Sequence, residues 1–114
     1  MRVRQFRDLQ VWQKAMALAR EIYRVSQSFP RAEQFGITSQ IRRAAVSVPS
    51  NIAEGHGRFS DKTFILFLGQ ARGSLYELEM QAELAESLGY MKRADLDRIL
   101  SQCGEVGRML SRPG

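Results

Sequence analysis

The sequence has very few residues of the kinds that build covalent or metal-dependent sites. It contains a single cysteine, Cys103, and a single histidine, His56, in 114 residues. Helical metal sites need several histidine and acidic ligands at fixed spacing. The chain also lacks a P-loop, and the glycines around His56 lack the third glycine and the preceding strand of a dinucleotide-binding loop. These absences predict a protein that is not an enzyme and that holds no metal or cofactor.

Long uncharged runs are missing as well. No segment approaches the ~18 consecutive apolar residues of a membrane helix. The first stretch, MRVRQFRDLQVWQK, is charged throughout, which is untypical of a signal peptide or an anchor. A single cysteine permits no internal disulfide and suits a reducing compartment. We therefore expect a cytoplasmic protein.

Proline is scarce, and no segment alternates between apolar and polar residues, so strands are not expected. Apolar residues instead recur every three or four positions, which predicts helices over about 8–28, 37–56, 61–88 and 92–111. Short connections between long amphipathic helices predict an all-α fold, an antiparallel up-down four-helix bundle formed by one domain over residues 1–114.

Local signals support these helices. Asp8 and Ser60 are the expected N-caps of the first and third helices, and Gly89 is expected to end the third. The repeating apolar positions of the first helix are Leu9, Trp12, Met16, Ala19 and Tyr23, with Ala15, Ile22 and Ser26 beside them. Those of the last helix, expected to face inward, are Leu96, Ile99, Leu100, Cys103, Val106, Met109 and Leu110.

Pro49 lies in the middle of the second predicted helix. An interior proline removes a backbone hydrogen bond and clashes with the carbonyl four residues earlier, at a cost of roughly 3 kcal/mol. Either two helices meet there, or one helix bends. The apolar face continues across the proline, and Gly55 and Gly57 supply a later stop, so one bent helix is favoured. Three polar side chains are expected to satisfy the backbone groups that the bend frees: Ser47, Ser50 and Asn51.

The third predicted helix has two apolar faces. One matches a bundle core and consists of Phe64, Phe67, Leu68, Ala71, Leu75, Leu78 and Ala82. The other lies on the opposite side and consists of Ile65, Gly69, Gly73, Tyr76, Met80 and Leu84. Since a four-helix bundle does not need both, the second face is interpreted as an oligomer interface. The alternative is a wider core that the N-terminal arm covers, with Phe6 packed over this face.

Positive charge is concentrated in one half of the chain. Residues 1–60 hold ten Lys/Arg against four Asp/Glu, whereas residues 61–114 hold seven against eight. Most of the basic residues are arginines, whose planar guanidinium groups suit phosphate. The candidate nucleic-acid contacts are Arg20, Arg24, Arg42, Arg43 and Arg58, with Lys14 and Arg7 as possible extensions of the patch. Each can equally be a solvated charge, and Arg58 can instead pair with Glu54.

Three stretches carry a family resemblance: "FRDLQVWQKAMALAREIY", "FP…E…FGITSQIRRAAVSVPSNIAEGHGR" and "FLGQARGSLYELEMQAELAESLGY". They resemble the four-helix-bundle family named after the 23S rRNA intervening sequence protein, from about Phe6 to Leu110. The resemblance implies closed rings of five bundles. A related branch, the accessory variability protein of diversity-generating retroelements, binds nucleic acid and a reverse transcriptase through a basic surface. Most members have no established role.

These observations lead to one functional hypothesis and two alternatives. The hypothesis is a non-catalytic homo-oligomer, a homopentamer by the resemblance, that binds nucleic acid, RNA in particular, mainly through phosphate contacts. The first alternative is a protein-interaction scaffold or accessory subunit, for example to a reverse transcriptase. The second is a small helical enzyme, which the absences described above disfavour.

Overall fold

The computed structural model of the chain describes residues 5–58 and 60–111, and these residues form helices joined by short turns. Two short 3-10 helices, η1 (Phe6–Asp8) and η2 (Arg31–Glu33), accompany four α-helices. The α-helices are α1 (Gln10–Ser26), α2 (Ile37–His56), α3 (Asp61–Ser87) and α4 (Arg93–Leu110). Within those two ranges there is no strand. The prediction of an all-α four-helix bundle is confirmed.

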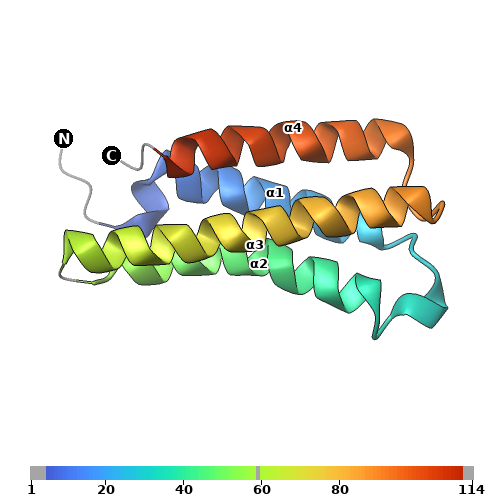
Figure 1. Cartoon of the computed structure of the whole chain (residues 1–114), viewed down its shortest axis with the longest axis horizontal. Helices are drawn as coiled ribbons and strands as arrows, with labels where there is room; N and C mark the ends of the chain where they lie inside the picture. Colours follow the sequence, from blue (N-terminus) through green and yellow to red (C-terminus); the bar gives the residue numbers. More distant parts are fainter. Residues whose placement is uncertain (1–4, 59, 112–114) are drawn as a thin grey trace.

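The four α-helices run side by side along a body of 44 × 25 × 18 Å (Figure 1). Each helix packs against the helices before and after it in the chain, and α4 closes the bundle by packing against α1. The centre of the bundle is filled by aliphatic side chains that are less than 2% exposed, among them Leu18, Ile22, Ile41, Ile52, Leu75, Leu78 and Ile99. This arrangement leaves one side of every helix facing outward.

The ends of α3 follow the local signals in the sequence. The Ser60 side chain accepts a hydrogen bond from the backbone N–H of Thr63 at 3.2 Å, which confirms this N-cap. At the other end Gly89 adopts a positive φ of 82°. The N–H of Tyr90 then donates to the Ala85 carbonyl at 2.9 Å, a six-residue loop typical of a helix that ends at glycine.

The expected cap of the first helix is wrong. Asp8 lies in η1, and α1 begins only at Gln10, with Leu9 at the N-cap position and no side-chain cap. The Leu9 N–H instead donates to the Phe6 carbonyl at 3.0 Å. An N-cap residue normally has an extended backbone conformation. Asp8 does not have it, because Asp8 belongs to the 3-10 helix η1.

The buried face of α1 also differs from the predicted one. Ala15, Ala19, Ile22 and Ser26 are buried as expected, and Val11, Leu18 and Val25 complete the buried face. Trp12 and Met16 are only half-buried, and Tyr23 is exposed. Because α1 packs against both α2 and α4, its buried face points between them. Trp12, Met16 and Tyr23 lie instead at the α2 edge of this face.

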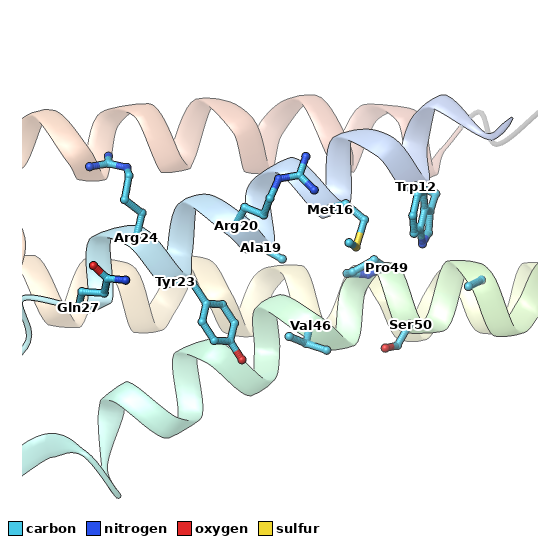
Figure 2. Close-up of a pocket in the computed structure, with 11 residues that line it drawn as sticks. Trp12, Met16, Ala19, Arg20, Tyr23, Arg24, Gln27, Val46, Pro49 and Ser50 are labelled. Atoms are coloured by element: carbon cyan, nitrogen blue, oxygen red, sulfur yellow. The ribbon is translucent and has the colours of Figure 1, made fainter. Parts of the chain in front are cut away.

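Helix α2 runs through Pro49 without a break, as predicted. Figure 2 shows that α2 changes direction near Pro49, and the half before the proline diverges from α1. The Asn51 side chain donates to the Ser47 carbonyl at 2.9 Å, and the Ser47 and Ser74 hydroxyls lie 2.8 Å apart, which ties the bend to α3. Of the three predicted side chains, Asn51 therefore bonds a backbone carbonyl near the bend, although not that of Ala45, four residues before the proline. The Ser47 hydroxyl bonds the side chains of Asn51 and Ser74 instead, and Ser50 is exposed.

Gly55 was expected to help end α2, but the helix continues through it to His56 and is capped by Gly57. Gly55 is buried, and a Cβ atom placed there would lie 2.5 Å from the Cβ of Phe67 on α3. The glycine therefore permits the close approach of α2 and α3 rather than a helix stop.

Candidate interaction surfaces

The two residues with the most reactive side chains are placed among apolar neighbours. Cys103 is buried, and this burial raises the pKa of its thiol to about 12, so the reactive thiolate does not form at neutral pH. The ring of His56 packs edge-on against Phe64, with 6.0 Å between ring centroids. Across residues 5–58 and 60–111, no group of three or more His, Cys, Asp or Glu side chains can hold a metal ion.

Arg42, one of the candidate nucleic-acid contacts, joins two helices within the chain. Its Nε donates to the Ser26 hydroxyl at 2.7 Å, and its guanidinium lies 4.7 Å from the centre of the Tyr23 ring. Ser26 is a buried polar residue whose hydroxyl accepts from Arg42 and donates to the Tyr23 carbonyl. Arg42 therefore fixes α2 against the end of α1.

Arg24 belongs to an ion-pair network between α1 and α4. Glu21 accepts hydrogen bonds from Arg24 Nε at 3.1 Å and from Arg98 Nε at 2.9 Å, and Asp95 pairs with both arginines. The hydrogen bond from Arg24 is the main cause that lowers the pKa of Glu21 to about 2. Lys14, on the same helix, pairs with Glu105 at 3.4 Å. The basic groups on this side of α1 are therefore largely neutralised by α1 and α4.

Arg58 pairs with Glu54 at 3.2 Å, which was the predicted alternative to a nucleic-acid contact. Its guanidinium lies 5.0 Å from the centre of the Phe67 ring. Arg20 and Arg43 differ from the other three candidates. Both are exposed, and neither takes part in an ion pair in the part of the chain that the structure describes. The five arginines therefore do not form a single patch of free charges.

The second apolar face of α3 is open to solvent. Ile65 is 65% exposed, Tyr76 60% and Met80 56%, and Leu84, Gly69 and Gly73 are exposed as well. We call these six residues the outer stripe. Phe6 does not cover it, because its ring packs against Trp12 with 5.1 Å between centroids. The remainder of the N-terminal arm, residues 1–4, lies outside the described residues.

A second apolar surface lies between α1 and α2, and it was not anticipated from the sequence. It is a groove of about 610 Å³, which we call the α1/α2 groove. Figure 2 shows its floor near Ala19 and Pro49, with the Arg20 and Arg24 guanidinium groups pointing away from α2. The residues that line it are Trp12, Met16, Ala19, Arg20, Tyr23, Arg24, Gln27, Val46, Pro49, Ser50 and Ala53.

The sequence carried a signal for this groove, namely the row of Trp12, Met16 and Tyr23 on one side of α1. These residues are among the repeating apolar positions of the first helix, and such spacing fits a buried face equally well. Spacing identifies a face of a helix, but the bend of α2 at Pro49 decides whether that face is fully covered. In Figure 2 the half of α2 before Pro49 leaves α1, and the groove extends from this opening, beside Tyr23 and Val46, past the proline to Trp12.

The fold and the exposed surfaces define the chain as a helical bundle with outward apolar faces and no recognisable catalytic constellation in its described residues. A family model described as 23S rRNA-intervening sequence protein matches residues 7–112. The chain therefore belongs to this family, which confirms the resemblance read from its sequence. No curated protein matches the sequence.

A solved structure supports the same assignment. It is a protein of unknown function from the S23 ribosomal protein family of Bacteroides thetaiotaomicron. It is similar to this chain with a TM-score of 0.82 and 25% sequence identity, and the similarity covers 90% of this chain and 95% of the other. None of the helices in the described ranges is long and apolar enough to span a membrane. Neither description assigns an enzymatic activity.

Proposed function

We propose that this chain is a non-catalytic, cytoplasmic, self-associating helical bundle that binds nucleic acid, RNA in particular, through its arginine-bearing surface. The observation that carries the proposal is the outer stripe of α3. Five bundles in a closed ring are the expected assembly, from the family resemblance. A repeated basic surface in such an assembly would raise a weak single-site affinity by multivalency.

The outer stripe has the properties of an unpartnered interface. Its side chains are more than 40% exposed although Ile65, Tyr76, Met80 and Leu84 are large and apolar. Burial of such surface stabilises an association by roughly 25 cal/mol per Å² before the costs of ordering. Gly69 and Gly73 lie between these side chains, and a Cβ added to either would meet no described atom within 4 Å. A partner helix can therefore approach the backbone of α3 closely.

The phosphate contacts are assigned to exposed arginines that do not hold the fold together. Arg43 is exposed without an intramolecular ion pair among the described residues, and Arg58 pairs only with the exposed Glu54. Such surface pairs contribute about 1 kcal/mol or less and exchange readily for a phosphate. Arg20 extends this surface along α1, whereas Arg24, also a candidate, is already paired with Glu21 and Asp95. Arg42 is the least suitable member because it already binds Ser26.

Sedimentation tests the self-association. The wild-type chain at micromolar concentration should sediment as a multiple of its 13.0 kDa monomer. Met80→Glu or Gly73→Arg should lower this mass, because each places a charge in a desolvated contact. Ala94→Glu, at an exposed position of α4, is the matched control and should leave the mass unchanged. A monomeric wild-type protein would refute this half of the proposal.

Fluorescence anisotropy with a structured RNA tests the nucleic-acid half. Binding should weaken by orders of magnitude between about 50 and about 200 mM salt, because released counterions dominate phosphate binding. Arg43→Glu combined with Arg58→Glu should weaken binding to all sequences alike. Lys92→Glu combined with Arg93→Glu changes the net charge equally at the exposed start of α4 and should have a much smaller effect. Absence of binding at the lower salt would leave the protein-scaffold alternative in its place.

A further inference from the structure

A small pocket lies at one end of the bundle, between the end of α1 and the start of α2. Its volume is about 360 Å³, and the loop that contains η2 forms part of its wall. We call it the η2 pocket, and its polar wall consists of Ser26, Gln27, Arg31, Gln34, Thr38 and Arg42. It shares Gln27 with the α1/α2 groove and no residue with the outer stripe, so it is distinct from both apolar surfaces.

The charged residues of the pocket wall are both basic. They are Arg31 and Arg42, and no Asp or Glu of the described residues lines the pocket. Glu33, the closest acidic residue in sequence, is held by other partners. Its carboxylate accepts hydrogen bonds from the Tyr90 hydroxyl at 2.9 Å and from the backbone N–H of Ile37 at 3.4 Å. Arg31 is exposed and forms no ion pair with a described residue. The wall therefore carries positive charge that its own residues do not neutralise, which suits an anion.

Arg42 is fixed in this wall by contacts within the chain. Its Nε donates to the Ser26 hydroxyl at 2.7 Å, its guanidinium lies over the Tyr23 ring, and its Nη2 is 3.5 Å from the Tyr23 carbonyl. Among the described residues, Nη1 has no hydrogen-bond partner, so both of its N–H groups are free for a ligand. The contacts that make Arg42 unsuitable as a mobile surface contact therefore hold it in place for a ligand in the pocket.

The pocket wall also contains a polar atom without a partner. The Oγ1 atom of Thr38 is buried and makes no hydrogen bond to a described residue. A buried group left unpaired costs about 1–3 kcal/mol, and most such groups in proteins are paired. Threonine in a helix divides between two χ1 rotamers, so rotation about χ1 can turn this hydroxyl toward a ligand. Thr38 is therefore a third donor for an anion that the two arginines attract.

We propose that the η2 pocket binds one phosphate group, held by the guanidinium groups of Arg31 and Arg42 and by the Thr38 hydroxyl. A guanidinium group presents parallel N–H donors to two phosphate oxygens, and a hydroxyl donates to a third. A pocket favours a phosphate at the end of a strand, because an internal phosphate carries a sugar on both sides. The expected ligand is the terminal phosphate of an RNA strand, which rests on the RNA binding proposed above. Free phosphate has the same chemistry and is the second source.

Two short single-stranded RNAs of one sequence, with a 5′-phosphate or a 5′-hydroxyl, test the proposed ligand. In fluorescence anisotropy with a 3′ dye, the wild type should bind the 5′-phosphate RNA about tenfold more tightly, a ratio typical of hydrogen bonds to a charged group. Arg31→Gln and Thr38→Val should each remove most of this preference. Arg108→Gln is the matched control and should keep it. This change removes an exposed arginine from the last turn of α4, at the end of the bundle opposite the η2 loop in Figure 1.

Thermal unfolding with inorganic phosphate tests the pocket without RNA. Phosphate should raise the unfolding temperature of the wild type and of Arg108→Gln more than that of Arg31→Gln or Thr38→Val, with chloride at equal ionic strength as the reference. The variants correct for the general stabilising effect of phosphate on exposed surface. Without phosphate, Thr38→Val should unfold at the wild-type temperature or above it, because valine has a similar shape and no hydroxyl to leave unpaired.

The outcomes separate the pocket from the proposed function. Equal binding of the two RNAs, with a phosphate-induced shift that Arg31→Gln and Thr38→Val do not reduce, would overturn the η2 pocket and leave RNA binding through other arginines intact. A shift that both variants reduce, in a protein that binds neither RNA, would support the pocket with free phosphate as its ligand and refute the proposed function. A loss of stability in Thr38→Val without phosphate would show that the hydroxyl stabilises the fold and would overturn its role as a ligand contact.

Discussion

The two faces of α3 are similar in apolar content and opposite in environment. Leu75 and Leu78 on the inner face are 1% and 0% exposed, whereas Tyr76 and Met80 on the outer face are 60% and 56% exposed. Folding of the chain explains why the inner face is apolar, since it fills the core between α2 and α4. Filling of the core cannot explain why the outer face is apolar, because its side chains are exposed. The comparison teaches that stability within the chain accounts for only one of the two apolar faces of this helix, and the exposed face is the one to which we assign the proposed contact outside the chain.

The largest expected difference between the two faces is in stability. Leu78→Ala should lower the free energy of unfolding by about 2–5 kcal/mol, because it leaves a cavity in the core. Met80→Ala should change it by no more than about 0.5 kcal/mol in the dissociated chain. Urea unfolding measures both values, at a protein concentration low enough to dissociate any assembly. Equal losses for the two variants would contradict the division between inner and outer face.

Glycines give a second comparison. Gly55→Ala should destabilise the fold by about 1–3 kcal/mol, because the new methyl group would overlap Phe67 where α2 and α3 approach. Thermal unfolding followed by circular dichroism checks this loss. A variant as stable as the wild type would show that the two helices separate without cost and that the close approach at Gly55 is unimportant.

The ion-paired side of α1 provides an exposed surface whose charges are satisfied within the chain. The pKa of Glu21 falls from 4.5 to about 2 on folding, chiefly through the hydrogen bond from Arg24. A lowered carboxyl pKa contributes stability that is complete above about pH 4.5 and is lost as the pH falls toward 2. Glu21→Gln should remove this part of the pH dependence of stability. It should also lower the free energy of unfolding by about 1 kcal/mol at neutral pH. Urea unfolding of both proteins between pH 2 and pH 7 provides the test. Parallel pH profiles for both would contradict the assigned role of Glu21.

The smallest expected effect concerns the outer stripe. Gly73→Ala should stabilise the isolated chain by about 0.5–1 kcal/mol, because alanine favours a helix and its Cβ meets no described atom within 4 Å. The same change should weaken self-association if a partner helix approaches at Gly73. Unfolding of the dissociated chain and dilution-dependent sedimentation measure the two effects separately. A loss of stability in the dissociated chain would mean that Gly73 is already covered by its own bundle.

Much of the fold was predictable because its signals are local. The periodic spacing of apolar residues, the capping hydroxyl of Ser60 and the glycine at position 89 each act within a few residues of one helix. The bent passage through Pro49 was also predictable, since the apolar face of α2 continues from Val48 to Ile52 and both are fully buried.

The other features of the fold and of the candidate surfaces depend on contacts between helices, which the spacing of apolar residues does not encode. The role of Gly55 depends on Phe67 from another helix, and Arg42 is held by Ser26, sixteen residues earlier in the chain. The buried face of α1 is decided by the positions of α2 and α4. The outer stripe was the exception among the surfaces, because α3 carries more apolar positions than one bundle can bury.

Sedimentation equilibrium of the wild-type chain and of Met80→Glu, each over a range of micromolar concentrations, is the most direct test that the outer stripe is a self-association surface. The account predicts a wild-type mass that is a multiple of 13.0 kDa, with five chains the expected number, and a variant that dissociates to one chain with its helicity unchanged. A wild-type mass of one chain at every concentration, or a variant that assembles as the wild type does, would contradict it.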